Sequence, residues 1–276
     1  MPFASIRGAK LYYERHGASG DPTVLVHGSL TDHHIWDSLV PPLAQNLEVL
    51  TYDRRGYGQS AGPIRTHPVR DDATDLSDLL EEIDLFPAHV IAHSYGGAVA
   101  FRLALDRPEM VRSLAVHEPP FVGLLEDDPG TEAEAKRLLL GIRAIQSLMR
   151  AGDLPTAVRE IVEAFSAEGG AWSRLPPQAQ QQLIRNGPRW SEEFDDPEAI
   201  RPEVPGLVDL LVPVLLSFGE RSPQFLRRVN EALARSLRNA SVLMIPDAGH
   251  VPHLTAPDQY SGVLLNFLLE RNVPTS

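Results

Sequence analysis

The chain contains 276 residues, which is enough for one large domain, or a core with an insertion, around a substantial apolar interior. Its 25 basic and 37 acidic residues give a net charge of −12, and Lys and Arg form no run, so we expect no nucleic-acid partner and no binding to an anionic membrane surface. The chain has no cysteine, which excludes disulfides, thiolate metal ligands and a cysteine nucleophile.

The first residues of the chain show neither the basic segment nor the apolar segment of a secretory signal. A membrane-spanning helix needs roughly 18 consecutive apolar residues, and the longest uncharged apolar run, residues 210–218, is too short. We therefore expect a cytoplasmic protein without a membrane partner.

Short apolar runs that end in turn residues alternate with longer helical patterns along most of the chain. Residues 11–15, after a turn at Gly8, are predicted to form an antiparallel edge strand. Six further runs are predicted strands: 23–26, 49–52, 89–92, 114–116, 212–218 and 242–245. Helical spacing covers residues 71–85, 95–105, 224–237 and 258–269. Runs rich in β-branched residues and leucine between helices are typical of a mostly parallel sheet covered on both faces, which is an α/β architecture.

The alternation of strands and helices stops after Val116. From about residue 120 to 205 only helical patterns occur, at 132–149, 156–165 and 178–184, and prolines are frequent at both borders. We therefore predict a core formed by residues 1–119 and 206–276, with residues 120–205 inserted as a helical cap or lid.

Ser94 lies in the segment Ala92-His93-Ser94-Tyr95-Gly96-Gly97, between a predicted strand and a predicted helix. A strand, a tight turn and a helix form the context of a nucleophile elbow, in which small residues are needed two positions before and two positions after the serine. Ala92 and Gly96 meet this requirement, although glycine is more usual at the first position. Ser94 is therefore the candidate nucleophile.

A serine hydroxyl needs a base, usually a histidine that a carboxylate holds in one tautomer. His250 is the best of the ten histidines, because it follows the last predicted strand and precedes the final helix, so its loop can reach over the sheet edge. His253 is expected to pack or to form hydrogen bonds within the same loop.

Four motifs occur in an order that resembles the α/β-hydrolase superfamily: His27-Gly28-Ser29, residues 53–60, the elbow at Ser94, and Gly249-His250. The resemblance covers roughly residues 23–270 apart from the insertion. It implies an α/β-hydrolase fold with an oxyanion hole formed by the backbone N–H groups of Ser29 and Tyr95. It also implies that Asp53 and Arg54 belong to a structural turn.

The acidic member of the triad departs from the commonest pattern of that family. Many members carry an aspartate after the strand matched by residues 212–218, where this chain has Ser222, preceded by Glu220. Haloalkane dehalogenases and some lactonases carry the acid after the strand that follows the elbow helix, and this chain has Glu118 there, 118 − 94 = 24 residues beyond Ser94. We assign Glu118 as the acid, and Glu220 or a water-assisted Ser-His dyad remains the alternative.

Two other motifs are interpreted as structural. Gly56, Gly58 and Ala61 match a dinucleotide-phosphate pattern, but Pro63 follows where a helix should open, so we expect no cofactor. The segment Asp32-His33-His34 resembles a set of metal ligands, yet adjacent histidines on a helix point to different faces and Thr31 or Asp32 suits an N-cap, so we expect no metal.

These features predict a serine hydrolase that cleaves a small apolar carboxylic ester or lactone through an acyl-enzyme. Relatives that cleave carbon–halogen bonds or epoxides use aspartate in place of Ser94, which disfavours those reactions. Cofactor-free perhydrolysis and carbon–carbon bond hydrolysis would use the same triad, and a ligand receptor that retains the pocket is the non-enzymatic alternative. The residues assigned to substrate binding are Leu30, Trp36, Phe121, Trp190 and Val251, with Phe165 and Trp172 as further aromatic candidates that could equally be buried in the core.

Overall fold

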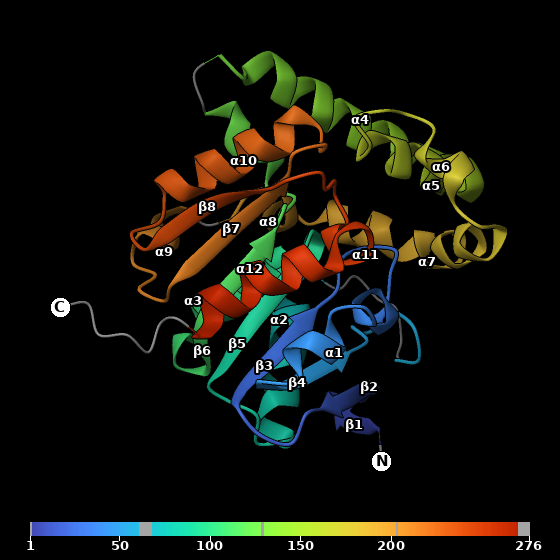
Figure 1. The fold of residues 1–276 in the computed structure, drawn as a ribbon. Helices are drawn as coiled ribbons and strands as arrows, with labels where there is room; N and C mark the ends of the chain where they lie inside the picture. The colour runs from blue at the N-terminus through green and yellow to red at the C-terminus, as the bar shows by residue number, and fades with distance from the viewer. Residues whose placement is uncertain (1, 61–67, 128–129, 203, 270–276) are drawn as a thin grey trace.

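The computed structural model describes residues 2–60, 68–127, 130–202 and 204–269 (Figure 1). Ala61 and Pro63, on which part of the dinucleotide interpretation depended, lie outside these residues.

The described residues form one sheet with the strand order β1-β2-β4-β3-β5-β6-β7-β8. Its strands are β1 (Phe3–Ile6), β2 (Ala9–His16), β3 (Asp21–Val26), β4 (Leu47–Tyr52), β5 (Ala88–His93), β6 (Val111–His117), β7 (Val214–Gly219) and β8 (Ala240–Ile245). From β4 to β8 all neighbouring strands are parallel, and β1 and β2 are antiparallel to their neighbours. The predicted mostly parallel α/β sheet is therefore confirmed.

The prediction that residues 11–15 form an edge strand is wrong. They belong to β2, which lies between β1 and β4, and β1 is the edge strand. The chain turns between β1 and β2 at Arg7 and Gly8, whose φ angles of 46° and 77° suit the tight turn of a two-residue hairpin. Only the turn at Gly8 indicated in the sequence that another strand precedes β2. Strand β1 has four residues, which is too short to show a clear alternation of apolar and polar residues.

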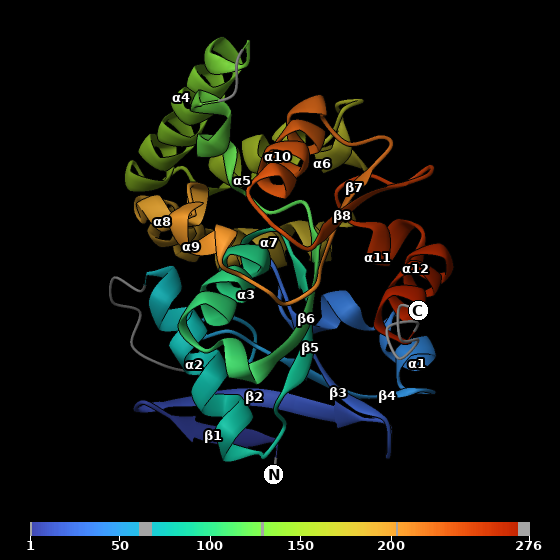
Figure 2. The same cartoon turned by 90° about the vertical axis from the view of Figure 1, so that its left-hand side faces the viewer.

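Helices cover both faces of the sheet. Figure 2 shows α2 (Val69–Glu82) and α3 (Tyr95–Asp106) on one side, with α1 (Val40–Leu43) and α12 (Pro257–Leu269) on the other. Strand residues alternate between the two cores, so that Val24 and Val26 pack with α2 and α3 whereas Leu25 packs with α1 and α12. Helix α10 (Gln224–Arg235) completes the first of these cores.

Most of the described residues between β6 and β7 are helical, and this whole segment is called the inserted helices below. They comprise η3 (Val122–Glu126), α4 (Glu132–Arg150), α5 (Leu154–Ala164), α6 (Ala171–Arg174), α7 (Pro177–Asp195), α8 (Pro197–Ile200) and α9 (Val204–Val208). Helices α4, α5 and α6 lie at the end of the molecule that is remote from β1 (Figure 1). The remaining short helices are η1 (His33–Trp36), η2 (Pro108–Met110) and α11 (Pro252–Thr255).

Helix α7 is much longer than the predicted residues 178–184, because it continues through Pro188 to Asp195. A proline inside a helix removes one backbone hydrogen bond and so weakens the local signal for a helix. Here packing outweighs that cost, since Trp190, Glu193 and Phe194 are buried beyond the proline.

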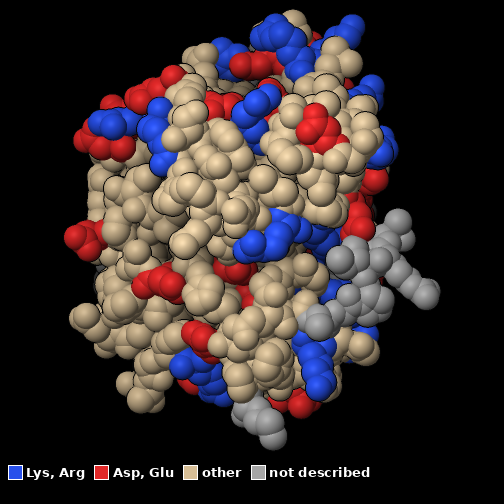
Figure 3. Space-filling view, turned by 90° about the vertical axis from the view of Figure 1, so that its right-hand side faces the viewer, with Lys and Arg blue, Asp and Glu red and all other residues tan. Residues whose placement is uncertain are grey.

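The surface carries both signs of charge. On the face drawn in Figure 3, Lys and Arg are interspersed with Asp and Glu around a broad uncharged area. Among the described helices none combines the length and the apolar character that crossing a bilayer requires.

Candidate active site

Ser94 occupies the turn between β5 and α3, with φ of 52° and ψ of −123°. A positive φ strains a residue with a side chain, and such strain is typical of a nucleophile elbow. Gly96 makes the turn possible, because a Cβ atom there would lie 2.3 Å from the carbonyl oxygen of Val26. The backbone N–H of Ser94 donates to His117 O at 2.9 Å, which ties the elbow to the end of β6.

The backbone N–H groups of Ser29 and Tyr95 donate no hydrogen bond to any described residue. Tyr95 is the first residue of α3, where a helix has free N–H groups and the positive end of its dipole. Ser29 follows the end of β3, and this strand pairs directly with β5. Within the described part of the chain both N–H groups are therefore free to bind an anionic oxygen.

Glu118 and His250 come together at the carboxyl ends of the strands. His250 Nδ1 donates to Glu118 Oε2 at 2.6 Å, and the other carboxylate oxygen of Glu118 accepts from the backbone N–H of Gly219 at 2.8 Å. Glu118 is fully buried, whereas His250 lines the same cavity as Ser94. The structure contains no hydrogen bond between the described side chains of Ser94 and His250. Catalytic hydrogen bonds of this kind are often long before a substrate binds.

The alternative acid, Glu220, is directed elsewhere. Its exposed carboxylate accepts from the backbone N–H of Asp247 at 2.9 Å and so braces the loop that leads to His250. The described contacts of Glu220 therefore place it beside the loop rather than beside the imidazole.

Electrostatics keep Glu118 ionised. Burial alone would raise the pKa of this carboxyl, but the neighbouring His117 and the hydrogen bond from His250 outweigh burial and hold the pKa below its ordinary value. Burial lowers the pKa of His117 to about 4, so this imidazole is neutral at pH 7, where the hydrogen bonds from His250 and from the Gly219 N–H are the contacts that stabilise the carboxylate. A buried negative charge thus faces His250 Nδ1.

Two further side chains contact His250, one at its backbone and one at its ring. The sequence analysis did not predict a contact with His250 for either of them. His93 Nε2 donates to the backbone oxygen of His250 at 2.8 Å. Phe165, from the inserted helices, stacks on the His250 ring with centroids 4.4 Å apart and planes inclined by 19°. His253 is fully buried against Trp36 and His93, and its ring nitrogens have no hydrogen-bond partner among the described residues, so it packs without bonding within the loop.

A cavity of about 760 Å³ opens beside Ser94 and His250. Of the residues assigned to substrate binding, Leu30, Trp190 and Val251 line it. Of the two further aromatic candidates, Phe165 lines the cavity and Trp172 does not. The inserted helices also add apolar side chains that the sequence analysis did not name, namely Ile161, Val162, Leu183 and Phe194.

The assignment of Trp36 and Phe121 to this lining is wrong. Trp36 is fully buried and packs against His253, with ring centroids 4.9 Å apart. Phe121 is 1% exposed and packs against Phe101. Both stand near site residues in the sequence, but their side chains point into the two cores beside the sheet.

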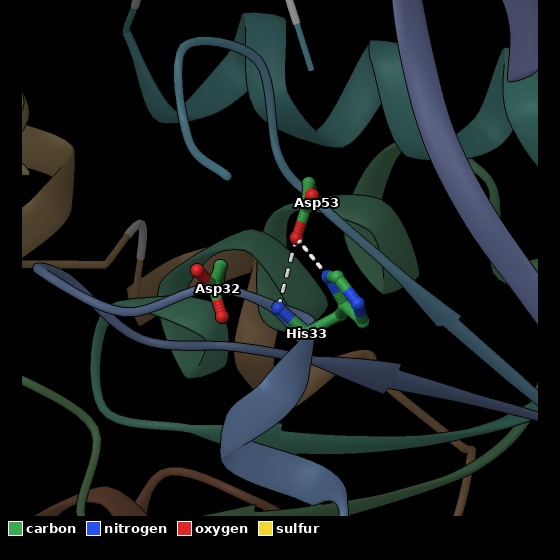
Figure 4. Close-up of side chains that lie close together, drawn as sticks. All are labelled: Asp32, His33 and Asp53. Carbon is green, nitrogen blue, oxygen red and sulfur yellow. Dashed lines mark hydrogen bonds and ion pairs between the residues drawn. The ribbon is translucent and has the colours of Figure 1, made fainter. Parts of the chain in front are cut away.

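The side chains that could together hold a metal ion are Asp32, His33 and Asp53, and Figure 4 shows the hydrogen bonds between His33 and Asp53. Asp53 Oδ1 accepts from both the backbone N–H and Nδ1 of His33, at 2.9 and 2.7 Å. Asp53 Oδ2 accepts from Gln59 N, and Asp32 Oδ2 accepts from Gln182 Nε2, each at 2.7 Å. The described donors therefore occupy the carboxylate oxygens that a cation would need.

A family profile described as alpha/beta hydrolase fold matches residues 21–257. The chain is 28% identical over 273 residues to a protein of Azorhizobium caulinodans with the provisional name carbamate hydrolase RutD, a match that covers 97% of this chain and 98% of that protein.

Solved structures are also similar to this fold. An esterase from Thermogutta terrifontis has a TM-score of 0.76 at 22% identity, covering 99% of this chain and 98% of that one. Est816, described as an N-acyl homoserine lactone degrading enzyme, has a TM-score of 0.72 at 26% identity, covering 96% of this chain and all of its own (100%).

Proposed function

This chain belongs to the α/β-hydrolase family, and from that premise we propose that it hydrolyses a small apolar carboxylic ester or lactone through Ser94, His250 and Glu118. The observation that carries the proposal is the 2.6 Å hydrogen bond between His250 and the buried Glu118. The same His250 lines one cavity together with Ser94, whose backbone is strained. A carboxylate that orients an imidazole beside a serine is the arrangement that activates a hydroxyl at neutral pH.

In the proposed reaction Ser94 Oγ attacks the acyl carbon while His250 takes its proton. The carbonyl oxygen becomes an oxyanion, which the N–H groups of Ser29 and Tyr95 stabilise, each by roughly 3–4 kcal/mol in the transition state. Collapse of the tetrahedral intermediate breaks the acyl–oxygen bond, and the leaving alkoxide takes the proton from His250. Water, deprotonated by His250, then attacks the acyl-enzyme and releases the acid and free Ser94.

The inserted helices are proposed to act as the cap that closes this site. They contribute most of the apolar lining of the cavity, and Phe165 from the same segment packs on the His250 ring. An apolar cavity favours an apolar acyl or alcohol group over a charged one.

Carbamate hydrolysis is the second candidate, favoured by the full-length similarity to the Azorhizobium caulinodans protein. A carbamate presents the same kind of acyl carbon to a serine, so the triad would act in the same way. The two candidates differ in the leaving group and in the acyl group that the cavity accepts.

The proposal is tested with purified protein on p-nitrophenyl esters of two to eight acyl carbons, on γ-lactones and on an aryl carbamate. We expect ester or lactone turnover that Ser94→Ala abolishes, and a single covalent adduct on Ser94 after treatment with an aryl phosphonate. A protein that turns over none of these compounds but gains thermal stability with some of them would instead be a receptor, and the hydrolase proposal would be wrong.

A further inference from the structure

Glu193 is a fully buried carboxylate on α7, one of the inserted helices, yet all its described hydrogen-bond partners belong to the core. Its Oε2 accepts from Ser29 Oγ at 2.5 Å. Its Oε1 accepts from Arg54 Nη2 at 2.7 Å and from the Tyr57 hydroxyl at 2.9 Å. A buried charge is stable only when such partners satisfy it, so α7 is held firmly against the loop that contains Ser29.

Arg54, which is bound to Glu193, also binds the backbone of the two residues before Ser29. Its Nε donates to His27 O at 3.1 Å and its Nη2 donates to Gly28 O at 3.0 Å. The carbonyl of Gly28 and the N–H of Ser29 belong to one planar peptide unit and point in opposite directions when that unit is trans. Binding the Gly28 carbonyl on the Arg54 side therefore directs the Ser29 N–H away from Arg54.

Other residues of α7 grip the same loop. Asn186 Nδ2 donates to Leu30 O at 2.9 Å and Gln182 Nε2 donates to Asp32 Oδ2 at 2.7 Å. Residues 182, 186 and 193 follow the spacing of a single helix face. One face of α7 thus contacts residues 29, 30 and 32, directly after β3.

We propose that Glu193 is a positioning residue, which fixes the direction of the Ser29 N–H both through the Ser29 hydroxyl and through Arg54. The inference rests on the proposed function, in which that N–H stabilises the oxyanion. It adds that docking of the inserted helices completes the oxyanion hole, so that this segment contributes to the rate of the chemical step as well as to the shape of the cavity.

A purely structural role for Glu193 predicts different kinetics. If the carboxylate only neutralises Arg54, its loss would lower stability and leave the turnover of folded enzyme unchanged. If it positions Ser29, its loss weakens binding of the transition state more than binding of the substrate, which lowers kcat with little change in KM.

The experiment compares Glu193→Gln, Ser29→Ala and the double variant, with p-nitrophenyl butyrate as substrate and phenylboronic acid as a probe that forms a tetrahedral adduct on Ser94. Ser29→Ala keeps the backbone N–H and removes only the hydroxyl. We expect each single variant to lower kcat by about 10-fold to 100-fold, with KM within about threefold and the Ki of the boronic acid raised in parallel. The double variant should lose less than the product of the two single losses, because both act on one N–H.

Glu192→Gln is the matched control, since Glu192 neighbours Glu193 on α7 but is partly exposed and paired with Arg189. Its kcat should stay within about twofold of wild type, because a partly exposed ion pair contributes little to stability and the described hydrogen bonds of Ser29 and Arg54 do not involve Glu192. If Glu193→Gln does not fold, Ser29→Ala and Ser29→Thr decide the matter, because threonine keeps the hydroxyl and should restore most of the rate that alanine loses.

Folded Ser29→Ala and Glu193→Gln variants with wild-type kcat would overturn this inference. Ser94→Ala, measured in the same assay, separates that result from failure of the proposed function. An inactive Ser94→Ala beside fully active Ser29 and Glu193 variants rejects the inference alone, whereas an active Ser94→Ala rejects the serine mechanism itself.

Discussion

Glu118 and His250 are 132 positions apart in the chain, and Glu118 Oε2 lies 2.6 Å from His250 Nδ1. The two residues meet because each follows the carboxyl end of a parallel strand, β6 for Glu118 and β8 for His250, with β7 between them. Gly219, at the end of β7, donates its N–H to the same carboxylate. A hydrogen bond that involves an ionised group is roughly twice as strong as a neutral one, so this contact holds the imidazole in one orientation.

Glu118→Gln should lower kcat by about 100-fold to 10,000-fold, by analogy with the loss of the acid from other triads. The amide keeps the size of the side chain but removes the charge that faces His250 Nδ1. Steady-state kinetics on the best p-nitrophenyl ester provide the measurement. Glu220→Gln is the matched control and should have a much smaller effect, because Glu220 is exposed and bonds to the backbone of Asp247. The reverse ranking would show that Glu118 is not the acid.

Gly96→Ala should destabilise the protein by about 3 kcal/mol, because its new methyl group has no room beside the Val26 carbonyl oxygen, which lies 2.3 Å from the Cβ position. Gly141→Ala is the control, because Gly141 is a solvent-exposed residue in the middle of α4 and nothing lies within 4 Å of its Cβ position. There the replacement should stabilise the protein by up to about 1 kcal/mol through helix propensity. Urea unfolding of both variants measures the difference, and equal effects would contradict the close packing of the elbow.

His27 should make stability depend on pH. Burial, helped by the charge of Arg54, lowers the pKa of His27 to about 3, so the folded protein keeps this ring neutral. The unfolded chain binds a proton near the ordinary value of about 6.5, so it binds more protons than the folded state between pH 3 and pH 6.5. Stability is therefore complete above pH 6.5 and falls as the pH decreases through this window.

His27→Gln removes that contribution. The free energy of unfolding of wild type should fall more steeply than that of the variant, by about 1.4 kcal/mol per pH unit between pH 6 and pH 4. Urea unfolding at half-unit intervals of pH provides the measurement. Parallel curves for the two proteins would mean that His27 is protonated in the folded state or does not titrate differently on unfolding.

Leu183→Trp should narrow the range of acyl chains that the enzyme accepts. Leu183 lines the cavity from α7, and a larger side chain there would occupy space that a long acyl group needs. Each methylene buried contributes about 0.8 kcal/mol, so excluding two of them should lower kcat/KM for the octanoate ester relative to the acetate ester by more than about tenfold. Leu140→Trp, on α4 at a position 52% exposed, serves as the control and should leave this ratio unchanged. A ratio that changes equally in both variants would contradict the cavity as the acyl site.

Local patterns in the sequence were enough to predict the sheet, the helices that cover it and the elbow. Residues 89–92 and 95–105 were predicted as a strand and a helix, and the structure has β5 and α3 there with Ser94 between them. These features are visible because burial of a strand and of one helix face imposes a regular spacing on neighbouring residues. The resemblance to a family added the order of the motifs and with it the candidate acid.

Only the tertiary structure decided where each side chain points and what it meets. It put Glu118 rather than Glu220 beside His250, turned Trp36 and Phe121 into the cores, and continued α7 past Pro188. It also paired Glu193 with Arg54, a residue 139 positions away. No local pattern predicts such contacts, because they depend on which surfaces of distant segments pack together. In the sequence a carboxylate that will be buried looks the same as one that will be exposed, since its partners lie far away along the chain.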